Sequence, residues 1–165
     1  MPFIGLTGGL GTGKTTVLNL FKKLGAKTIS ADTIVHDLLK RSGIRKKLTS
    51  CLGKDILMKR ASRTYINKKR MAEVIFNDPQ KRKATEEIIH PEVKKIALQK
   101  KQIMLKKNKK TLIVFEVPLL FEAGFQNIFD KIIVVFSRKD TTLKRLAQLG
   151  LSREQAIQRI KAQMP

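Results

Sequence analysis

The chain has 165 residues, and its 42% hydrophobic content is sufficient for one domain with a real core and room for an inserted subdomain. Its longest apolar runs are far shorter than a membrane-spanning helix requires, and the N-terminus shows no basic and apolar regions of a signal peptide. A single cysteine, Cys51, excludes an internal disulfide and a cysteine metal cluster. We therefore expect a cytoplasmic protein without membrane contact.

The charge is strongly positive, with 35 Lys and Arg residues against 13 Asp and Glu residues and a formal net charge of +22. Eight lysines lie between Lys94 and Lys110. A nucleic-acid surface is one explanation of this run. We favour a solvated helix face, because aromatic residues make up only 5% of the chain and no aromatic stripe accompanies the lysines. We accordingly expect no nucleic-acid partner.

The first predicted elements are a short buried strand at 3–6 and an amphipathic helix after residue 14, joined by a glycine-rich loop. Gly8, four residues, Gly13, Lys14 and Thr15 complete the pattern G-x-x-x-x-G-K-[ST], the Walker A phosphate loop. A glycine-rich turn that merely opens a helix is the alternative, and Lys14 and Thr15 after the last glycine disfavour it. We therefore predict a site for a nucleoside triphosphate.

The chemistry of this loop follows from its spacing. Glycines permit the positive φ angles that turn successive amides toward one phosphate, and the N-terminus of the following helix adds unpaired N–H groups and a positive dipole. Lys14 can reach the β- and γ-phosphates, and the Thr15 hydroxyl can bind Mg²⁺. The predicted ATP-binding residues are Gly8, Gly9, Gly11, Thr12, Gly13, Lys14, Thr15 and Thr16, with Thr15 as the metal ligand.

A second strand is predicted at 26–30, and a helix begins near Thr33. Asp32 lies between them, at the carboxyl end of the strand, where open parallel sheets bind their ligands. Its alternative role is to cap the next helix. The residues alone leave both roles open.

Residues 33–110 are predicted to be almost entirely helical, with breaks at Gly43, Gly53, Asn77–Pro79 and His90–Pro91 and with no strand. We interpret this segment as a helical insertion that holds a second substrate. On the residues alone, His90 is a packing or capping residue.

The third strand is predicted at 111–117, and Glu116 near its end occupies the position of a Walker B acid. A fourth strand follows at 131–136, then helices at about 139–149 and 152–163, the second of which begins with the capping box Ser152 to Gln155. This order of elements predicts a three-layer α/β fold with a parallel sheet. Its core comprises 1–32 and 111–137 within a single domain.

Motifs spread over essentially the whole chain resemble those of dephospho-CoA kinases. The phosphate loop alone is unspecific, whereas Val-Pro-Leu-Leu-Phe-Glu at 117–122 and Ile-His-Pro at 89–91, in this order and at these distances, are far more specific. The remaining matching segments are Ala31-Asp32, 52–57, 74–79, 87–88 and 150–165.

The resemblance implies a P-loop kinase fold in which 33–110 is a CoA-binding domain and 138–165 is a helical lid. It implies transfer of the γ-phosphoryl group of ATP, with Mg²⁺, to the ribose 3′-hydroxyl of dephospho-CoA. Asp32 would be the base or orienting residue, with Lys14 and Arg145 as the other catalytic residues. The matching motifs imply substrate contacts at Asp32, His90, Pro118, Leu119, Leu120 and Glu122. We expect a monomer or a small homo-oligomer.

Two features depart from the family pattern. Of two lid arginines four residues apart, Arg145 matches the first, but the stretch 146–149 is one residue short and lacks the second, for which Arg153 and Arg159 are the alternatives. The family also continues beyond the equivalent of Pro165 with a further strand and helix, so we expect that this chain lacks them.

Three other functions share parts of this pattern. A nucleoside or nucleotide kinase would differ only in its acceptor. A basic, RNA-binding P-loop NTPase would hydrolyse ATP in an RNA-stimulated and salt-dependent manner. A non-enzymatic nucleotide-binding regulator would need no acceptor.

Overall fold

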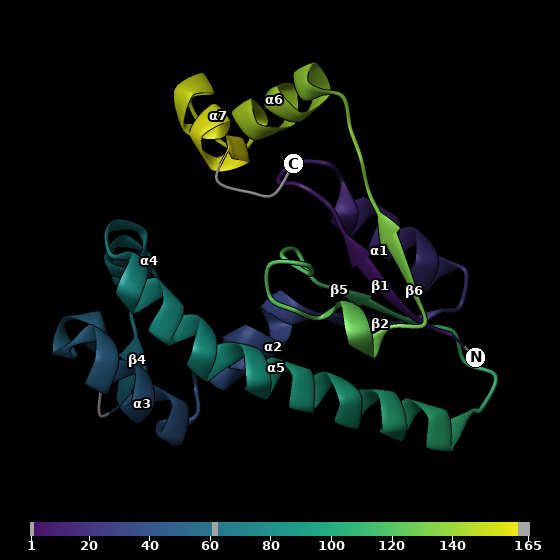
Figure 1. The fold of residues 1–165 in the computed structure, drawn as a ribbon, viewed down its shortest axis with the longest axis horizontal. Helices are drawn as coiled ribbons and strands as arrows, with labels where there is room; N and C mark the ends of the chain where they lie inside the picture. Colours follow the sequence, from purple (N-terminus) through teal and green to yellow (C-terminus); the bar gives the residue numbers. More distant parts are fainter. Residues whose placement is uncertain (1, 61–62, 162–165) are drawn as a thin grey trace. The chain divides into compact units, whose positions relative to one another are not determined.

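The computed structural model describes residues 2–60 and 63–161 (Figure 1). The chain divides into two compact units. Unit 1 comprises Met1–Ala31 and Gln99–Pro165, and unit 2 comprises Asp32–Leu98. Each unit is described by itself.

Unit 1 contains a parallel sheet of four strands in the order β2-β5-β1-β6. The strands are β1 (Phe3–Thr7), β2 (Lys27–Ser30), β5 (Ile113–Glu116) and β6 (Lys131–Val134). In the register, Glu116 is paired with Leu6 of β1 on one side and with Ser30 of β2 on the other. The predicted parallel α/β sheet is thereby confirmed, and its strands end at a common edge.

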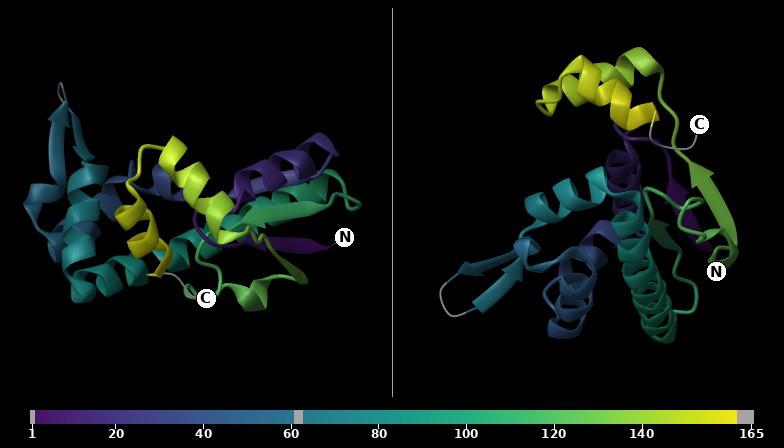
Figure 2. Two further views of the ribbon diagram at one scale, coloured as in Figure 1. Left: turned by 90° about the horizontal axis from the view of Figure 1, so that it is seen from above. Right: turned by 60° about the vertical axis from the view of Figure 1, so that its left-hand side comes forward.

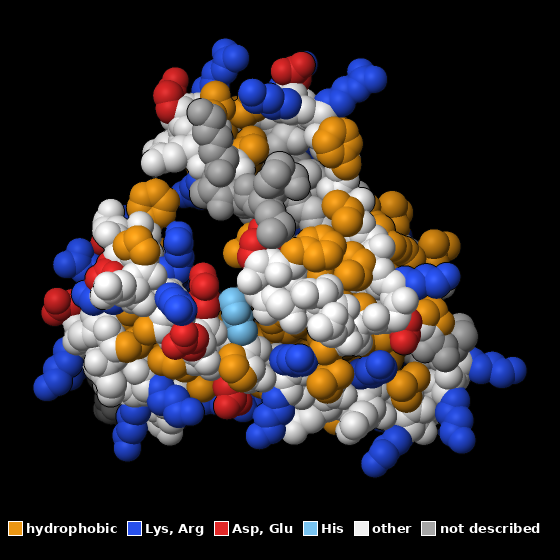
Figure 3. All heavy atoms as spheres, in the orientation of Figure 1, with side chains coloured by type: hydrophobic (Ala, Val, Ile, Leu, Met, Phe, Trp, Pro, Cys, Tyr) orange, Lys and Arg blue, Asp and Glu red, His pale blue; other side chains and the backbone are white. Residues whose placement is uncertain are grey.

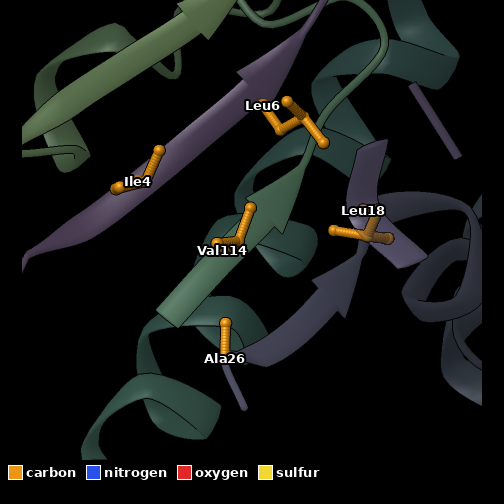
Figure 4. Close-up of a cluster of buried hydrophobic side chains, with 5 residues drawn as sticks. All are labelled: Ile4, Leu6, Leu18, Ala26 and Val114. Carbon is orange, nitrogen blue, oxygen red and sulfur yellow. The ribbon is translucent and has the colours of Figure 1, made fainter. Parts of the chain in front are cut away.

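Alternate residues of each strand pack against opposite faces of this sheet. On one face, a buried cluster joins the sheet to α1 (Lys14–Lys23) and consists of Ile4, Leu6, Leu18, Ala26 and Val114 (Figure 4). Val17 and Phe21 of α1 pack against the same cluster. This packing fixes the start of α1 at the end of β1, where the glycine-rich loop connects them.

The other face of the sheet carries an aromatic cluster. The ring centroids of Phe3 and Phe129 lie 4.9 Å apart, and those of Phe3 and Phe115 lie 6.2 Å apart. The ammonium of Lys101, from the C-terminal part of α5 (Pro79–Lys107), lies 4.6 Å from the centroid of Phe3. Helical segments therefore contact both faces, which gives the expected three layers.

Unit 2 is mainly helical. Its elements are α2 (Ala31–Leu38), α3 (Ser42–Leu52), the 3₁₀ turn η1 (Lys54–Ile56), the strands β3 (Leu57–Arg60) and β4 (Arg63–Ile66), α4 (Lys68–Asn77) and the N-terminal part of α5. Leu38, Leu48 and Ile56 are fully buried at its centre. The Asn67 side chain caps α4 by accepting a hydrogen bond from the Arg70 amide at 3.1 Å.

The hairpin of β3 and β4 contradicts the expectation of no strand in 33–110. The two strands are antiparallel, with Met58 opposite Tyr65, and they project from the helices of their unit (Figure 2). Each is only four residues long, too short for a clear period-two pattern, and helices flank the pair. The strand conformation of this segment depends on pairing between the two strands, which sequence periodicity does not reveal.

Two expected helix breaks are also wrong. Helix α5 continues through His90 and Pro91, because its buried side, with Ile89, Val93 and Ala97, offsets the one hydrogen bond that proline removes. The break expected at Gly43 lies earlier, since α3 already begins at Ser42. The breaks at Gly53 and Asn77–Pro79 are confirmed by the ends of α3 and α4.

After β6, unit 1 ends with two packed helices, α6 (Lys139–Gln148) and α7 (Arg153–Lys161). The predicted capping box is confirmed: the Gln155 amide donates to Ser152 Oγ at 3.2 Å, and the Ser152 amide donates to Gln155 Oε1 at 3.1 Å. The predicted helical end at Gln163 and the matching residues up to Pro165 lie outside the described residues.

The positive charge is widely distributed over the face of the protein that Figure 3 shows. On the face in Figure 3, Lys and Arg side chains are spread widely rather than gathered in one patch. The ion pairs found among the described residues are Lys40–Asp37, Arg70–Glu73 and Lys81–Asp78, all between partly or largely exposed side chains. Over the described part of the chain, no helix combines the length and apolar character needed to cross a membrane.

Candidate active site

The loop between β1 and α1 has the backbone geometry of an anion site. Gly8, Gly11 and Gly13 have φ angles of 146°, 74° and 100°, which residues with a Cβ rarely adopt. Helix α1 begins directly after Gly13 and has no acidic residue in its first turn. Its first amides and its positive dipole end are therefore not neutralised by a side chain of that turn.

The loop is also held by close packing. A Cβ atom on Gly8 would lie 2.2 Å from the carbonyl oxygen of Val135, the residue after β6. A Cβ atom on Gly11 would lie 3.1 Å from side-chain atoms of both Thr142 and Leu146 of α6. Glycine is thus required at Gly8 for space as well as for backbone conformation.

Lys14 folds back over the loop. Its Nζ donates hydrogen bonds to the carbonyl oxygens of Gly8 at 2.7 Å and Gly9 at 2.8 Å. These bonds hold a full positive charge at the start of the loop. This is where a lysine can neutralise the β- and γ-phosphates of a bound triphosphate.

Arg145 brings a second cation to the loop from α6. Its Nη1 donates to the carbonyl oxygens of Thr12 at 3.0 Å and Gly11 at 3.3 Å. The side chain is exposed. Sequence spacing assigns Arg145 to the segment after β6, and the packing of α6 on Gly11 brings it to the phosphate loop.

Thr15 and Glu116 place two oxygen ligands at the end of the sheet. The Thr15 hydroxyl donates to Glu116 Oε1 at 3.4 Å, and Glu116 is 7% exposed at the end of β5. Mg²⁺ prefers oxygen ligands at about 2.1 Å in an octahedron, whose adjacent oxygens lie roughly 3 Å apart. The pair therefore fits two neighbouring positions around such an ion, although the described residues hold no cluster of three acidic, His or Cys side chains.

A cavity of about 430 Å³ opens beside the loop, within unit 1. Most of its wall is apolar, with Phe121, Val134 and Phe136 exposed to it. Its polar margin includes Glu122, Ser137 and Lys139. The elements that line it include the phosphate loop (Gly8, Gly9, Leu10, Thr12), the segment after β5 (Pro118, Phe121, Glu122), the end of β6 and the residues after it (134–137), the start of α6 (Lys139, Thr142) and Ile160 of the last helix.

Comparison with known proteins identifies the family. A sequence model described as dephospho-CoA kinase matches residues 2–165. The chain belongs to the dephospho-CoA kinase family. Its motifs and phosphate loop, described above, agree with this assignment, so the resemblance inferred from the sequence is confirmed.

Individual relatives agree with the family match. A protein of Listeria monocytogenes serotype 4b named dephospho-CoA kinase is 35% identical over 164 residues, which cover 98% of this chain and 80% of that protein. The crystal structure of TT1252 from Thermus thermophilus superposes with a TM-score of 0.81 at 29% identity, covering 99% and 80%. A dephospho-CoA kinase structure from Campylobacter jejuni superposes with a TM-score of 0.67 at 31% identity, and the match covers 98% of this chain and 79% of that protein.

The residues predicted for the active site are divided between the two units. Lys14, Thr15, Arg145, Pro118 and Glu122 lie in unit 1, together with the glycines and threonines of the loop. Asp32 and His90 lie in unit 2. Asp32 is exposed in the first turn of α2, two residues after β2 ends, and within the described residues its carboxylate accepts no hydrogen bond.

His90 is half-buried in α5. Burial lowers the pKa of its imidazole, and the nearby carboxylate of Glu86 opposes this effect only in part. The side chain is therefore neutral at pH 7 and can accept or donate a hydrogen bond without carrying charge.

Among the predicted substrate contacts in unit 1, Leu119 and Leu120 do not line the cavity. Leu120 is fully buried, and a Cβ atom on Gly5 would lie 2.7 Å from its Cδ1 atom, so its side chain belongs to the core. Leu119 is 39% exposed but lies outside the cavity wall. The buried side chain of Leu120 offers no surface to a substrate, so a contact at this position would involve its backbone.

Sequence reasoning missed Phe121 and Lys139 as cavity residues. Phe121 stands inside the matching segment 117–122 without having been singled out. Lys139 is the first residue of α6, where a cation is unfavourable to the helix dipole, and this position was an available signal.

Proposed function

We propose that this chain transfers the γ-phosphoryl group of ATP to the ribose 3′-hydroxyl of dephospho-CoA, which yields coenzyme A and ADP. The membership of the dephospho-CoA kinase family supports the substrate pair. The observation that carries the proposal is the convergence of Lys14 and Arg145 on the carbonyl oxygens of one glycine-rich loop. Two cations held at a helix N-terminus suit a highly charged triphosphate.

Phosphoryl transfer requires little covalent chemistry from the protein and much positioning. The loop amides and the Lys14 ammonium hold the triphosphate. The Arg145 guanidinium, held beside the loop by the carbonyls of Gly11 and Thr12, stabilises the phosphate oxygens, whose negative charge spreads in the transition state.

Mg²⁺ is part of this proposal. The Thr15 hydroxyl and the Glu116 carboxylate would hold it, directly or through a water molecule. When bound, it neutralises charge that develops on the β- and γ-phosphate oxygens. Binding of Mg²⁺ would explain why a carboxylate is buried at the end of β5.

Asp32 orients the acceptor hydroxyl. Its carboxylate is exposed and has no hydrogen-bond partner within the described residues, so it is available to accept a hydrogen bond from a substrate. Accepting this bond aligns the hydroxyl oxygen for attack and removes its proton as the new bond to phosphorus forms. His90, neutral at pH 7, and the cavity residues Pro118 and Glu122 contact the acceptor.

Mass spectrometry of the reaction mixture tests the proposed function. Purified protein is incubated with ATP, MgCl₂ and dephospho-CoA, and the product is compared with authentic coenzyme A. We expect a phosphate ester at the 3′-hydroxyl, released in step with ADP. Parallel reactions with adenosine, AMP and CMP test the nucleoside and nucleotide kinase alternative, which requires phosphorylation of one of them in preference to dephospho-CoA.

Two other results would contradict the proposal. ATP hydrolysis that is stimulated by RNA, falls steeply with salt and yields no coenzyme A would favour the basic NTPase. Tight ATP binding without any acceptor would favour the regulator. A cytoplasmic location and a monomer or small homo-oligomer remain predictions, which cell fractionation and light scattering test.

A further inference from the structure

Helix α6 rests on the phosphate loop through one face. Thr142 and Leu146 lie against Gly11, and Arg145 bonds to the loop carbonyls. Lys139 precedes Thr142 by three residues and Leu146 by seven, so it lies on the same face, one turn closer to the start of the helix. The packing that brings Arg145 to the loop therefore also turns the side of α6 that carries Lys139 toward the loop.

The cavity beside the loop contains Lys139 together with Gly8, Gly9 and Leu10. The Lys14 ammonium bonds to the carbonyls of Gly8 and Gly9, so these two glycines mark the end of the loop where the β- and γ-phosphates bind. Lys139 therefore lines the same cavity as the end of the loop at which a P-loop lysine holds the β- and γ-phosphates.

The contacts within the described residues give Lys139 no structural role. Its side chain is exposed, and its ammonium makes no ion pair and no hydrogen bond among them. As the first residue of α6 it also lies at the positive end of the helix dipole, where a cation is unfavourable. An anion bound in the cavity would be attracted both to the Lys139 ammonium and to the positive end of the helix dipole, and it would offset their mutual repulsion.

We propose that Lys139 binds the γ-phosphate of ATP and stabilises the negative charge of its oxygens during transfer. This inference rests on the proposed function for the identity of the acceptor, but not for the binding of ATP. Neither Leu149 nor Arg153 lines this cavity: Leu149 is 74% exposed beyond the end of α6, and Arg153 borders a separate cavity with Lys144 and Asp140. Lys139 is thus a second cation that α6 supplies besides Arg145.

Comparison of Lys139→Gln with Lys144→Gln tests this assignment. Both changes remove one positive charge from an exposed position of α6, and Lys144 lies at the separate cavity. Isothermal titration calorimetry measures the affinity for the Mg²⁺ complexes of ADP and of the non-hydrolysable ATP analogue AMP-PNP. We expect Lys139→Gln to weaken AMP-PNP binding about tenfold and ADP binding less than twofold. Lys144→Gln should change neither.

Turnover provides the second measurement. With dephospho-CoA, Lys139→Gln should lower kcat about tenfold or more, and Lys139→Arg should retain most of the wild-type kcat, because it restores a cation at the same place. Thermal unfolding of the Gln variant should match that of the wild type, since no contact among the described residues is lost.

Three results would overturn the inference. The first is that Lys139→Gln and Lys144→Gln have the same nucleotide affinities and the same kcat. The second is that Lys139→Gln loses ADP affinity and AMP-PNP affinity to the same extent. The third is that Lys139→Gln raises KM for dephospho-CoA while kcat and nucleotide affinity stay unchanged. The last would assign Lys139 to the acceptor. If the wild type makes no coenzyme A, the proposed function fails, while the comparison of ADP and AMP-PNP still decides the role of Lys139.

Discussion

The phosphate loop and the lysine run at 94–110 both carry positive charge, but the side chains at the loop are bonded to the backbone and most of those in the run are exposed to solvent. In the loop, Lys14 and Arg145 are both held by backbone carbonyl oxygens, and Thr15 is held by Glu116. Along the run, none of the ion pairs found among the described residues includes a lysine of that segment.

The difference shows how position turns charge into function. Side chains that converge on one point lose mobility before a ligand arrives, so they bind and stabilise charge at little further entropic cost. Side chains spread along a helix face remain solvated and mobile, and they contribute chiefly a long-range field. The predictions below test this contrast, from the largest expected effect to the smallest.

Lys14→Ala should produce the largest effect. The change removes the full positive charge inside the loop, so we expect kcat/KM with ATP and dephospho-CoA to fall about 10³-fold or more, with the far-ultraviolet circular dichroism spectrum unchanged. Lys22→Ala, near the other end of the same helix, is the matched control and should retain activity. Near-normal turnover of a folded Lys14→Ala protein would refute the phosphate-loop mechanism.

Asp32→Asn should lower kcat with dephospho-CoA by about 10²-fold, the usual range for a general base. Affinity for Mg·ATP without acceptor should change less than about threefold, because the carboxylate acts on the acceptor rather than on ATP. A helix cap would be replaced equally well by asparagine, which would leave both values unchanged. A metal ligand would weaken both. Asp37→Asn, an exposed change in the same helix, is the control.

Glu116→Gln tests the proposed Mg²⁺ site. The amide keeps the size and a hydrogen-bond acceptor for Thr15 but removes the charge, so the Mg²⁺ concentration for half-maximal activity should rise about tenfold or more. Binding of ADP in the presence of EDTA should stay the same. An unchanged Mg²⁺ requirement would restrict Glu116 to a structural role.

Replacement of Lys94, Lys95, Lys100 and Lys109 by glutamine should have the smallest effect. All four side chains are exposed, so we expect kcat to change less than about twofold at physiological salt. Lys101 is excluded because its ammonium lies over the Phe3 ring, a contact worth about 0.5–1 kcal/mol. A large loss of turnover accompanied by loss of RNA affinity, measured by filter binding, would support a nucleic-acid surface instead.

Local spacing was enough to predict much of the core and of the loop. The Walker A residues, the strand before them and the helix after them lie within about twenty residues, and their geometry depends on neighbouring positions. The capping box from Ser152 to Gln155 is equally local, and both of its hydrogen bonds form. The parallel direction of the strands followed from the alternation of strands and helices, whereas their order in the sheet was not predicted.

Contacts between distant segments decided the rest. The hairpin of Met58 and Tyr65, the continuous helix through Pro91 and the burial of Leu120 depend on partners that no local pattern specifies. Likewise, helical spacing identifies Arg145 and Lys139 only as cations on a late helix, and the family resemblance, which assigns Arg145 to the lid, does not show which atoms it contacts. The glycine at position 11 has no side chain to keep α6 away, so the helix packs on the loop, and this packing alone brings Arg145 to the backbone carbonyls and Lys139 to the cavity.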